Sequence, residues 1–286
     1  MIIFPNCKIN LGLQIIRKRN DGYHDLQTVF YPTKIHDALE VIQNPGESVK
    51  KIQGKLGKGT VSEWLQFDCT GLNVENDPGS NLCLKAFQLL KKDFPQIPYS
   101  QMHLHKTIPI GAGLGGGSAD GAFTLLLLNQ KFGLGISRET LLDYALQIGS
   151  DCPFFIINKP CYATGRGEFL EHISLDLSSY RFMIVHPGIH INTSQVFSEI
   201  IPGDTNKSIK EIIQQPIETW RGELKNDFEE PIFKKYPEVK KIKNDLYQSG
   251  SIYASMSGSG SAVYGIFEKE HSRFPEFHPN YFVREI

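Results

Sequence analysis

Residues Pro109–Asp120, with the sequence PIGAGLGGGSAD, carry the clearest chemical implication in the chain. Glycine tolerates positive φ and lets the backbone approach a ligand, so successive N–H groups can converge on one anion. A helical pattern from Ser118 follows, and the start of a helix adds unpaired N–H groups and a positive dipole end. The segment therefore predicts a phosphate site, and a triphosphate is the natural occupant.

The same segment can be compared with several other nucleotide-binding motifs. Gly111, Gly113 and Gly116 satisfy G-x-G-x-x-G, but a dinucleotide fold needs a strand after the helix and an acidic residue at its end. Here FGLGIS and another helical pattern follow. A Walker A loop needs Lys-Ser/Thr after its last glycine, whereas Gly117 precedes Ser118, and the protein-kinase strings H-R-D and D-F-G are absent. A tight strand–helix turn without a ligand stays open.

Hydrophobic periodicity and turn residues predict the elements that must position this loop. Strands are expected at 8–16, 26–31, 38–43, 102–106 and 180–188, with two more inside 251–267 around a second glycine–serine loop. Helices are expected at 81–92, 118–129, 137–148, 208–214 and 237–249, the third with Ser137 as N-cap. The pattern changes near residue 160. We therefore expect an α+β fold with two domains, 1–159 and 160–286.

Composition excludes several classes of function. The chain has 286 residues, 40% of them hydrophobic, and a net charge of −1, so it has no basic field to attract nucleic acid or anionic lipid. No apolar run approaches the roughly 20 residues that span a bilayer. The cysteines have no paired spacing, which indicates reduced thiols rather than disulfides or a zinc site: they are Cys7, Cys69, Cys83, Cys152 and Cys161. We expect a cytoplasmic protein.

One local basic segment stands out against that neutral background. Lys50, Lys51, Lys55 and Lys58 fall within SVKKIQGKLGKGT. A solvated hairpin tip is the ordinary interpretation, and a role facing phosphate is the alternative.

Three motifs, two glycine loops and one N-terminal strand, together resemble those of the galactokinase–homoserine kinase–mevalonate kinase–phosphomevalonate kinase (GHMP) superfamily. They are PIGAGLGGGSA at 109–119, PNCKINL at 5–11 and MSGSGSA at 256–262. The resemblance implies an N-terminal, ATP-binding lobe similar to the second domain of ribosomal protein S5. It also implies a ferredoxin-like C-terminal lobe.

Within that superfamily the details resemble the kinases of 4-diphosphocytidyl-2-C-methyl-D-erythritol, which serve the non-mevalonate isoprenoid pathway. The matching strings are GGG at 115–117, DGYH at 21–24, GSDCPFF at 149–155, TGRGE at 164–168 and HPG at 186–188. Cys7, Ser150 and Cys152 depart from the usual family residues, and none removes a reactive group. The resemblance implies transfer of the γ-phosphoryl group of ATP to the 2-hydroxyl of this cytidine diphosphate-linked methylerythritol.

The resemblance also implies roles for single residues. Asp151 would be the general base, although an Asp before Cys-Pro-Phe-Phe is otherwise an ordinary helix N-cap or turn former. Lys8 would be a buried ammonium close to Asp151. The alternative for Lys8 is a solvated lysine at a strand edge. The loop that binds ATP would comprise Pro109, Ile110, Gly111, Ala112, Gly113, Leu114, Gly115, Gly116, Gly117, Ser118 and Ala119.

For the acceptor, the resemblance implies that Tyr23 and Phe197 sandwich the cytosine, with the backbone of His24 at the base edge. Thr193 would reach the diphosphate or the base. Asn10 would bind substrate hydroxyls or the pyrimidine, or else fill a polar gap. Gly258 and Ser259 would line the substrate site, unless their loop is a plain hairpin turn.

At the nucleotide end, Asn81, Leu82 and Lys106 match positions of the family's purine pocket. Mg²⁺ is expected with ATP, held mainly by phosphates and water, with Ser118 as its protein contact. Two rival functions stay open: another GHMP kinase, such as a mevalonate or homoserine kinase, and a non-catalytic nucleic-acid-binding protein. We expect a monomer or a weak homodimer.

Overall fold

The computed structural model describes residues 1–43, 60–61, 63–72, 81–192, 196–197, 200, 202 and 207–286. Helices and sheets both occur along the whole chain, which confirms the α+β prediction. The chain forms two compact units. Unit 1 comprises 1–7, 35–110 and 116–158, and unit 2 comprises 8–34, 111–115 and 159–286.

Unit 1 contains a five-stranded sheet in the order β1-β4-β7-β6-β5. The strands are β1 (Ile2–Ile3), β4 (Ala38–Gln43), β7 (Ser100–Lys106), β6 (Leu65–Gly71) and β5 (Thr60–Val61). β6 and β7 run parallel, and the other pairs are antiparallel. Burial alternates along β7, where Met102 and Leu104 are buried and His105 is exposed, so one face of the strand is covered and the other is open.

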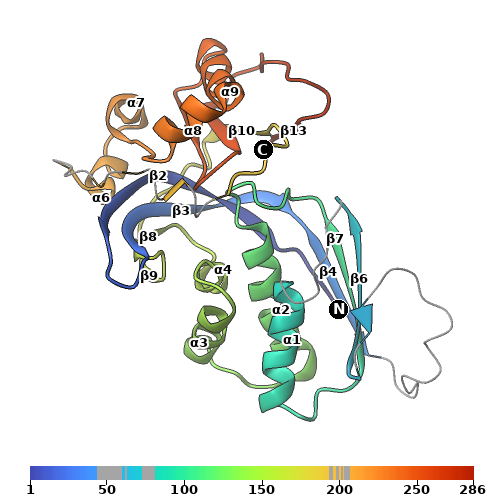
Figure 1. The fold of residues 1–286 in the computed structure, drawn as a ribbon. Coiled ribbons are helices and arrows are strands. Elements are labelled where there is room, and N and C mark those ends of the chain that lie inside the picture. Colours follow the sequence, from blue (N-terminus) through green and yellow to red (C-terminus); the bar gives the residue numbers. More distant parts are fainter. Residues whose placement is uncertain are drawn as a thin grey trace. The chain divides into compact units, whose positions relative to one another are not determined.

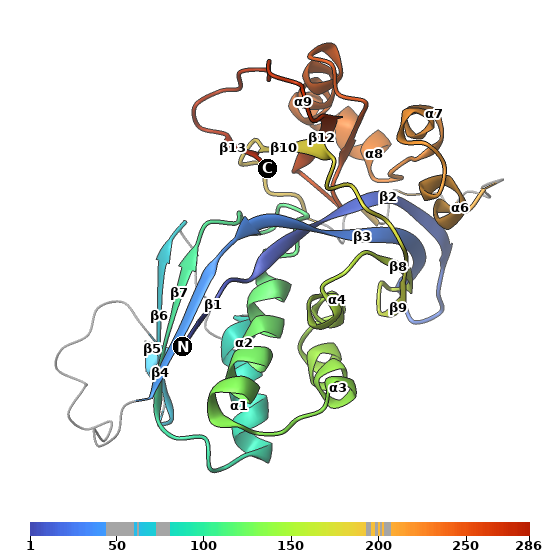
Figure 2. The ribbon, with the colours of Figure 1, turned by 180° about the vertical axis from the view of Figure 1, so that it is seen from behind.

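Helices cover the apolar face of this sheet (Figures 1 and 2). They are α1 (Leu82–Asp93) and α2 (Gly116–Phe132), while α3 (Arg138–Ile148) and α4 (Cys152–Ile157) pack on α2 away from the sheet. α2 packs against β1, β4 and the other three helices. Its buried residues include Ala119, Ala122, Leu125 and Leu128, which lie on several sides of the helix because it is surrounded by other elements. α2 is therefore the central helix of unit 1.

Unit 2 contains most of a four-stranded sheet ordered β2-β3-β8-β9 and all of a second sheet ordered β11-β12-β10-β13. The first has β2 (Asn6–Lys18), β3 (His24–His36), β8 (Cys161–Gly165) and β9 (Phe169–His172). The second has β11 (Tyr253–Met256), β12 (Val263–Glu268), β10 (Tyr180–His186) and β13 (Phe282–Glu285), all antiparallel.

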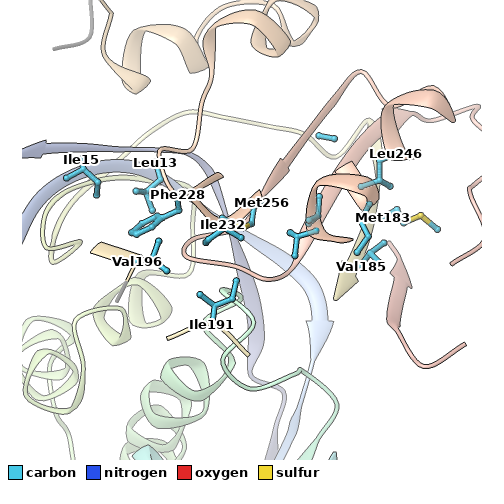
Figure 3. Close-up of a cluster of buried hydrophobic side chains, with 14 of the residues drawn as sticks. Leu13, Ile15, Met183, Val185, Ile191, Val196, Phe228, Ile232, Leu246 and Met256 are labelled. Carbon is cyan, nitrogen blue, oxygen red and sulfur yellow. The ribbon is translucent and has the colours of Figure 1, made fainter. Parts of the chain in front are cut away.

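A single apolar cluster joins β2 to the second sheet and its helices (Figure 3). Leu13 and Ile15 come from β2, Met183 and Val185 from β10, and Phe228 from the turn before α8. The helices of unit 2 are α6 (Ile209–Ile213), η2 (Ile217–Thr219), α7 (Trp220–Glu223), α8 (Glu229–Lys235) and α9 (Pro237–Gln248). This shared core fixes the backbone of β2, which carries two of the expected site residues.

Several predicted boundaries agree with the structure. The strand at 38–43 has the predicted bounds, and Ser137 caps α3 by accepting a hydrogen bond from the N–H of Thr140. Other boundaries differ: β2 and β3 are longer at both ends than the predicted strands at 8–16 and 26–31. α2 begins at Gly116 rather than at Ser118, so Gly116 and Gly117 belong to its first turn. The lysine segment at 50–58 lies outside the described residues. In the described part of the chain, no helix has the length and apolar character needed to span a membrane.

Candidate active site

The glycine loop is held in unit 2 through its carbonyl oxygens. The N–H of Lys8 donates to Leu114 O at 2.9 Å, and the N–H of Ala262 donates to Ala112 O at 3.0 Å. The hydroxyl of Ser257 donates to Gly113 O at 2.8 Å. The loop N–H groups take no part in these bonds. This arrangement fits a backbone that presents N–H groups to an anion.

Glycine is required at position 113. Its φ is +80°, and a Cβ added there would lie 2.0 Å from the carbonyl oxygen of Ser257. The second glycine–serine loop therefore packs directly on the first. An added Cβ at Gly258 would likewise lie 3.3 Å from Gly113 O.

Two polar residues, the buried Asn226 and the partly buried Glu229, hold that second loop and were missed by the sequence analysis. The Nδ2 of Asn226 donates to Met256 O and Gly258 O, each at 2.8 Å. The Oε1 of Glu229 accepts the N–H of Met256 at 2.9 Å. Neither residue stands in a recognisable motif, because each acts on backbone about 30 residues further along the chain. Only the fold reveals them.

Lys8 and Asn10 lie two residues apart on β2 and are both buried. The Nζ of Lys8 donates to Oδ1 of Asn10 and lies 4.7 Å from the ring centroid of Phe30. The Nδ2 of Asn10 donates to Thr28 Oγ1 at 3.0 Å. The alternative of Lys8 as a solvated lysine is therefore wrong. A buried ammonium with an amide neighbour is suited to stabilising negative charge that develops on a ligand.

The predicted cytosine residues occupy an aromatic region of unit 2. His24 and Phe197 stack with centroids 5.0 Å apart and an interplanar angle of 19°. Burial lowers the pKa of His24, so its ring is neutral at pH 7. Tyr23 is 56% exposed, and the guanidinium carbon of Arg166 lies 4.9 Å from its ring centroid. Arg166 belongs to the T-G-R-G-E string, and its contact with the Tyr23 ring was not predicted from the sequence. Thr193 lies outside the described residues.

In unit 1, the first turn of α2 lies beside the start of α4. The thiol of Cys152 is hydrogen-bonded to Ser118, and burial and the neighbouring Asp151 carboxylate raise the pKa of that thiol to about 12. Asp151 occupies the N-cap position of α4, but its carboxylate makes no capping hydrogen bond. Asp151 therefore stands at the N-cap position, in a turn, as the alternative expected, but without a side-chain capping bond. The structure thus brings Ser118 and the residue next to Asp151 together.

The predicted purine-pocket residues have clear structural partners. The Oδ1 of Asn81 caps α1 by accepting the N–H groups of Cys83 and Leu84 at 2.9 and 3.4 Å. The Nζ of Lys106 is buried and donates to Asp37 and to Asp120. Burial would lower the pKa of Lys106, but the two carboxylates outweigh it and raise that pKa.

The residues present fit a magnesium ion carried by a nucleotide, and not a cage built by the protein. Among the described residues, no group of three or more His, Cys, Asp or Glu side chains is arranged to hold a metal ion. Ser118 supplies a half-buried hydroxyl in the first turn of α2. Mg²⁺ keeps several waters and takes few protein ligands when phosphates bind it, so this donor set suits it.

Family models of the GHMP kinases match two segments of this chain. The family model described as "GHMP kinases N terminal domain" matches residues 81–159, and "GHMP kinases C terminal" matches residues 208–274. This confirms the predicted fold class.

Several curated relatives of this chain share one name. A protein of Azobacteroides pseudotrichonymphae called 4-diphosphocytidyl-2-C-methyl-D-erythritol kinase is 46% identical over 272 residues, covering 95% of each chain. A Bacteroides thetaiotaomicron protein of the same name is 46% identical and covers 94% of this chain and 93% of its own. A crystal structure of 4-(cytidine 5'-diphospho)-2C-methyl-D-erythritol kinase has a TM-score of 0.75 at 30% identity, covering 93% of this chain and 90% of that one.

Proposed function

This chain belongs to the 4-diphosphocytidyl-2-C-methyl-D-erythritol kinase family of GHMP kinases, and from that premise we propose that it transfers the γ-phosphoryl group of ATP to the 2-hydroxyl of this cytidyl sugar alcohol. In this reaction the acceptor oxygen forms a bond to the γ-phosphorus, the bond to the bridging oxygen breaks, and ADP leaves. The hydroxyl proton passes to a base. The protein's contribution is mainly positioning and charge stabilisation.

The observation that carries this proposal is the glycine loop held by its carbonyl oxygens. Three hydrogen bonds, from Lys8, Ser257 and Ala262, fix the loop on its carbonyl side. Residues 111–115 continue along the chain into the first turn of α2, whose first N–H groups have no intrahelical partners. These two donor sets support a role in binding the triphosphate of ATP.

We assign the proton transfer to Asp151 and the stabilisation of the developing alkoxide to Lys8. Asp151 lies at the start of α4, in the same unit as the first turn of α2, and the neighbouring Cys152 is hydrogen-bonded to Ser118 of that turn. Lys8 brings a buried ammonium, and in a low-dielectric environment such a charge acts on a nearby anion more strongly than in water. Asn10, which accepts from Lys8, orients that ammonium.

We assign recognition of cytosine to Tyr23, His24 and Phe197. The exposed ring of Tyr23 offers a flat surface for a base, and stacking of a base on an aromatic side chain contributes about 1–3 kcal/mol. Gly258 and Ser259 belong to the loop that packs on the glycine loop, which supports their assignment to the substrate site. Mg²⁺ would neutralise phosphate charge when bound with ATP, with Ser118 as its protein contact.

A coupled assay of ATP consumption tests this function directly. The purified protein is given ATP, Mg²⁺ and, in parallel, the cytidyl sugar alcohol, mevalonate or homoserine. We expect turnover with the cytidyl compound alone. Turnover of mevalonate or homoserine without the cytidyl compound would assign the chain to another GHMP kinase. Tight RNA binding with no ATP turnover would support the non-catalytic alternative.

A further inference from the structure

Three ionisable side chains form a buried triad in unit 1, beneath the start of α2. Asp37, Lys106 and Asp120 are 1%, 2% and 4% exposed. The Nζ of Lys106 donates to Oδ2 of Asp37, and to Oδ2 of Asp120 at 2.7 Å. Asp37 follows directly after β3, Lys106 ends β7 and Asp120 lies in α2. The triad therefore links two strands to the central helix.

The other oxygen of Asp37 holds the backbone that leads towards the glycine loop. Its Oδ1 accepts the N–H of Thr107 at 2.5 Å and the N–H of Ile108 at 2.9 Å. The N–H of Asp37 itself donates to Pro5 O at 2.8 Å. One carboxylate thus fixes both the end of β7 and the two residues after it.

Gly116, the first residue of α2, packs against Ile108 and lies close to the ammonium group of Lys106. A Cβ added at Gly116 would lie 2.8 Å from Cγ2 of Ile108 and 3.4 Å from Nζ of Lys106. Asp120, four residues further along, is bound to that Nζ. The first turn of α2 is therefore located by Ile108 and Lys106, whose own positions depend on Asp37.

Stability alone is a poor reason to bury an ammonium group between two carboxyl groups. A buried ion pair costs desolvation that its attraction only partly returns, and well-packed apolar residues often serve as well. Here the cost is visible: Oδ1 of Asp120 is buried with no hydrogen-bond partner among the described residues, and burial raises the pKa of the Asp120 carboxyl. The hydrogen bonds between Lys106 and the two carboxyl groups are directional, and they hold β7 and α2 in one relative position.

We infer that Asp37 and Asp120 are positioning residues that act through Lys106 to fix the first turn of α2 where it binds the phosphates of ATP. The inference rests on the proposed function for the nucleotide site only. Without either carboxylate, the first turn keeps its hydrophobic packing but loses its fixed position. The affinity for ATP falls, and that for the cytidyl substrate changes little.

Binding of ATP to the variants Asp37→Asn and Asp120→Asn, measured by calorimetry well below their unfolding temperatures, tests the inference. We expect Kd for ATP to rise about tenfold or more in both, and KM for the cytidyl substrate to change by less than about threefold. Leu90→Ala, which makes a cavity in α1 of the same unit, is the control for destabilisation alone. It is expected to unfold at lower temperature with an unchanged Kd for ATP.

The outcomes separate the alternatives. Wild-type Kd for ATP in both folded variants, or an equal loss for both substrates, overturns the inference. If Asp37→Asn does not fold, Asp120→Asn and Asp37→Glu decide, and the glutamate variant should recover part of the ATP affinity. Binding of ATP by the wild type without turnover of the cytidyl compound would refute the proposed acceptor and leave this inference standing.

Discussion

The hydroxyl of Ser257 donates a 2.8 Å hydrogen bond to the carbonyl oxygen of Gly113, two residues 144 positions apart in the chain. The same hydroxyl accepts the N–H of Asn10 at 3.2 Å. One serine therefore joins the glycine loop to β2, the strand that carries Lys8 and Asn10. Because an added Cβ at Gly113 would meet Ser257 O at 2.0 Å, this contact tolerates no side chain.

Gly113→Ala should therefore weaken ATP binding about tenfold or more and lower the unfolding temperature by several degrees. The added methyl group collides with backbone, and the φ of +80° is strained for alanine. Gly117→Ala is the matched control for stability, because its Cβ would meet no atom within 4 Å and it lies in a helix. That variant should unfold at the wild-type temperature or slightly higher. Equal unfolding temperatures for the two variants would contradict the described packing.

Asp151→Asn should lower kcat by a factor of about 10² or more and leave Kd for ATP within about twofold. The amide cannot accept the hydroxyl proton but keeps the shape of the side chain. Steady-state kinetics and calorimetry measure the two quantities. Asp93→Asn, an exposed aspartate in the same unit, should keep wild-type kcat. An unchanged kcat in Asp151→Asn removes that residue from the role of base.

Lys8→Met should lower kcat by about 10² or more with a change of less than about 2 kcal/mol in the free energy of unfolding. The buried ammonium is lost, and the thioether fills a similar volume without a desolvation cost. Urea unfolding followed by kinetics on the same preparation separates these effects. A variant that is less stable but fully active would give Lys8 a structural role alone.

Tyr23→Ala should raise KM for the cytidyl substrate about 10–100-fold, the range expected from the loss of one stacked base. Kd for ATP should stay at the wild-type value. Because the ring is 56% exposed, its removal costs little stability. Tyr23→Phe keeps the ring and should keep the wild-type KM. An equal loss of ATP affinity in Tyr23→Ala would argue against stacking of cytosine there.

His186 should make the protein sensitive to acid. Burial lowers its pKa to about 4 from the ordinary 6.5, and its Nε2 has no hydrogen-bond partner among the described residues. Between these two pH values the unfolded chain binds a proton that the folded chain does not, so stability is lost as the pH falls. The loss between pH 7 and pH 4 should be on the order of 2 kcal/mol for this group.

Thermal unfolding of His186→Gln across that pH range measures the effect. The variant should lose less stability on acidification than the wild type does. His172→Gln, at an exposed position in β9, should keep the wild-type acid sensitivity. Equal pH profiles for the wild type and His186→Gln would exclude His186 as the source.

The elements found from the sequence are those with strong local signals. β4 alternates cleanly, and α3 and α6 begin directly after Ser137 and Ser208, whose hydroxyls cap them. The sequence places the start of α2 two residues late, because Gly116 and Gly117 are poor helix formers. The short α4 and β13 gave too little periodicity to be predicted.

Residues of the candidate site could be proposed from the sequence where motifs contain them, and not where the fold brings them together. Lys8, Asp151 and the glycine loop stand in recognisable strings. Asp37, Asn226 and Glu229 do not, because their function is to bond backbone that is remote in sequence. Arg166 stood in a string, but its contact with Tyr23 depends on the pairing of β3 with β8 and could not be derived from the string alone.

The interleaving of the two compact units has a consequence for synthesis on the ribosome. Unit 2 takes residues 8–34 from near the start of the chain and 159–286 from its end. Leu13 and Ile15 of β2 emerge early, yet they share an apolar cluster with residues of β10 and α9, which are made much later. The nascent chain must therefore carry an apolar strand without these partners for most of translation. That strand is exposed to aggregation during this time and is a candidate for chaperone protection.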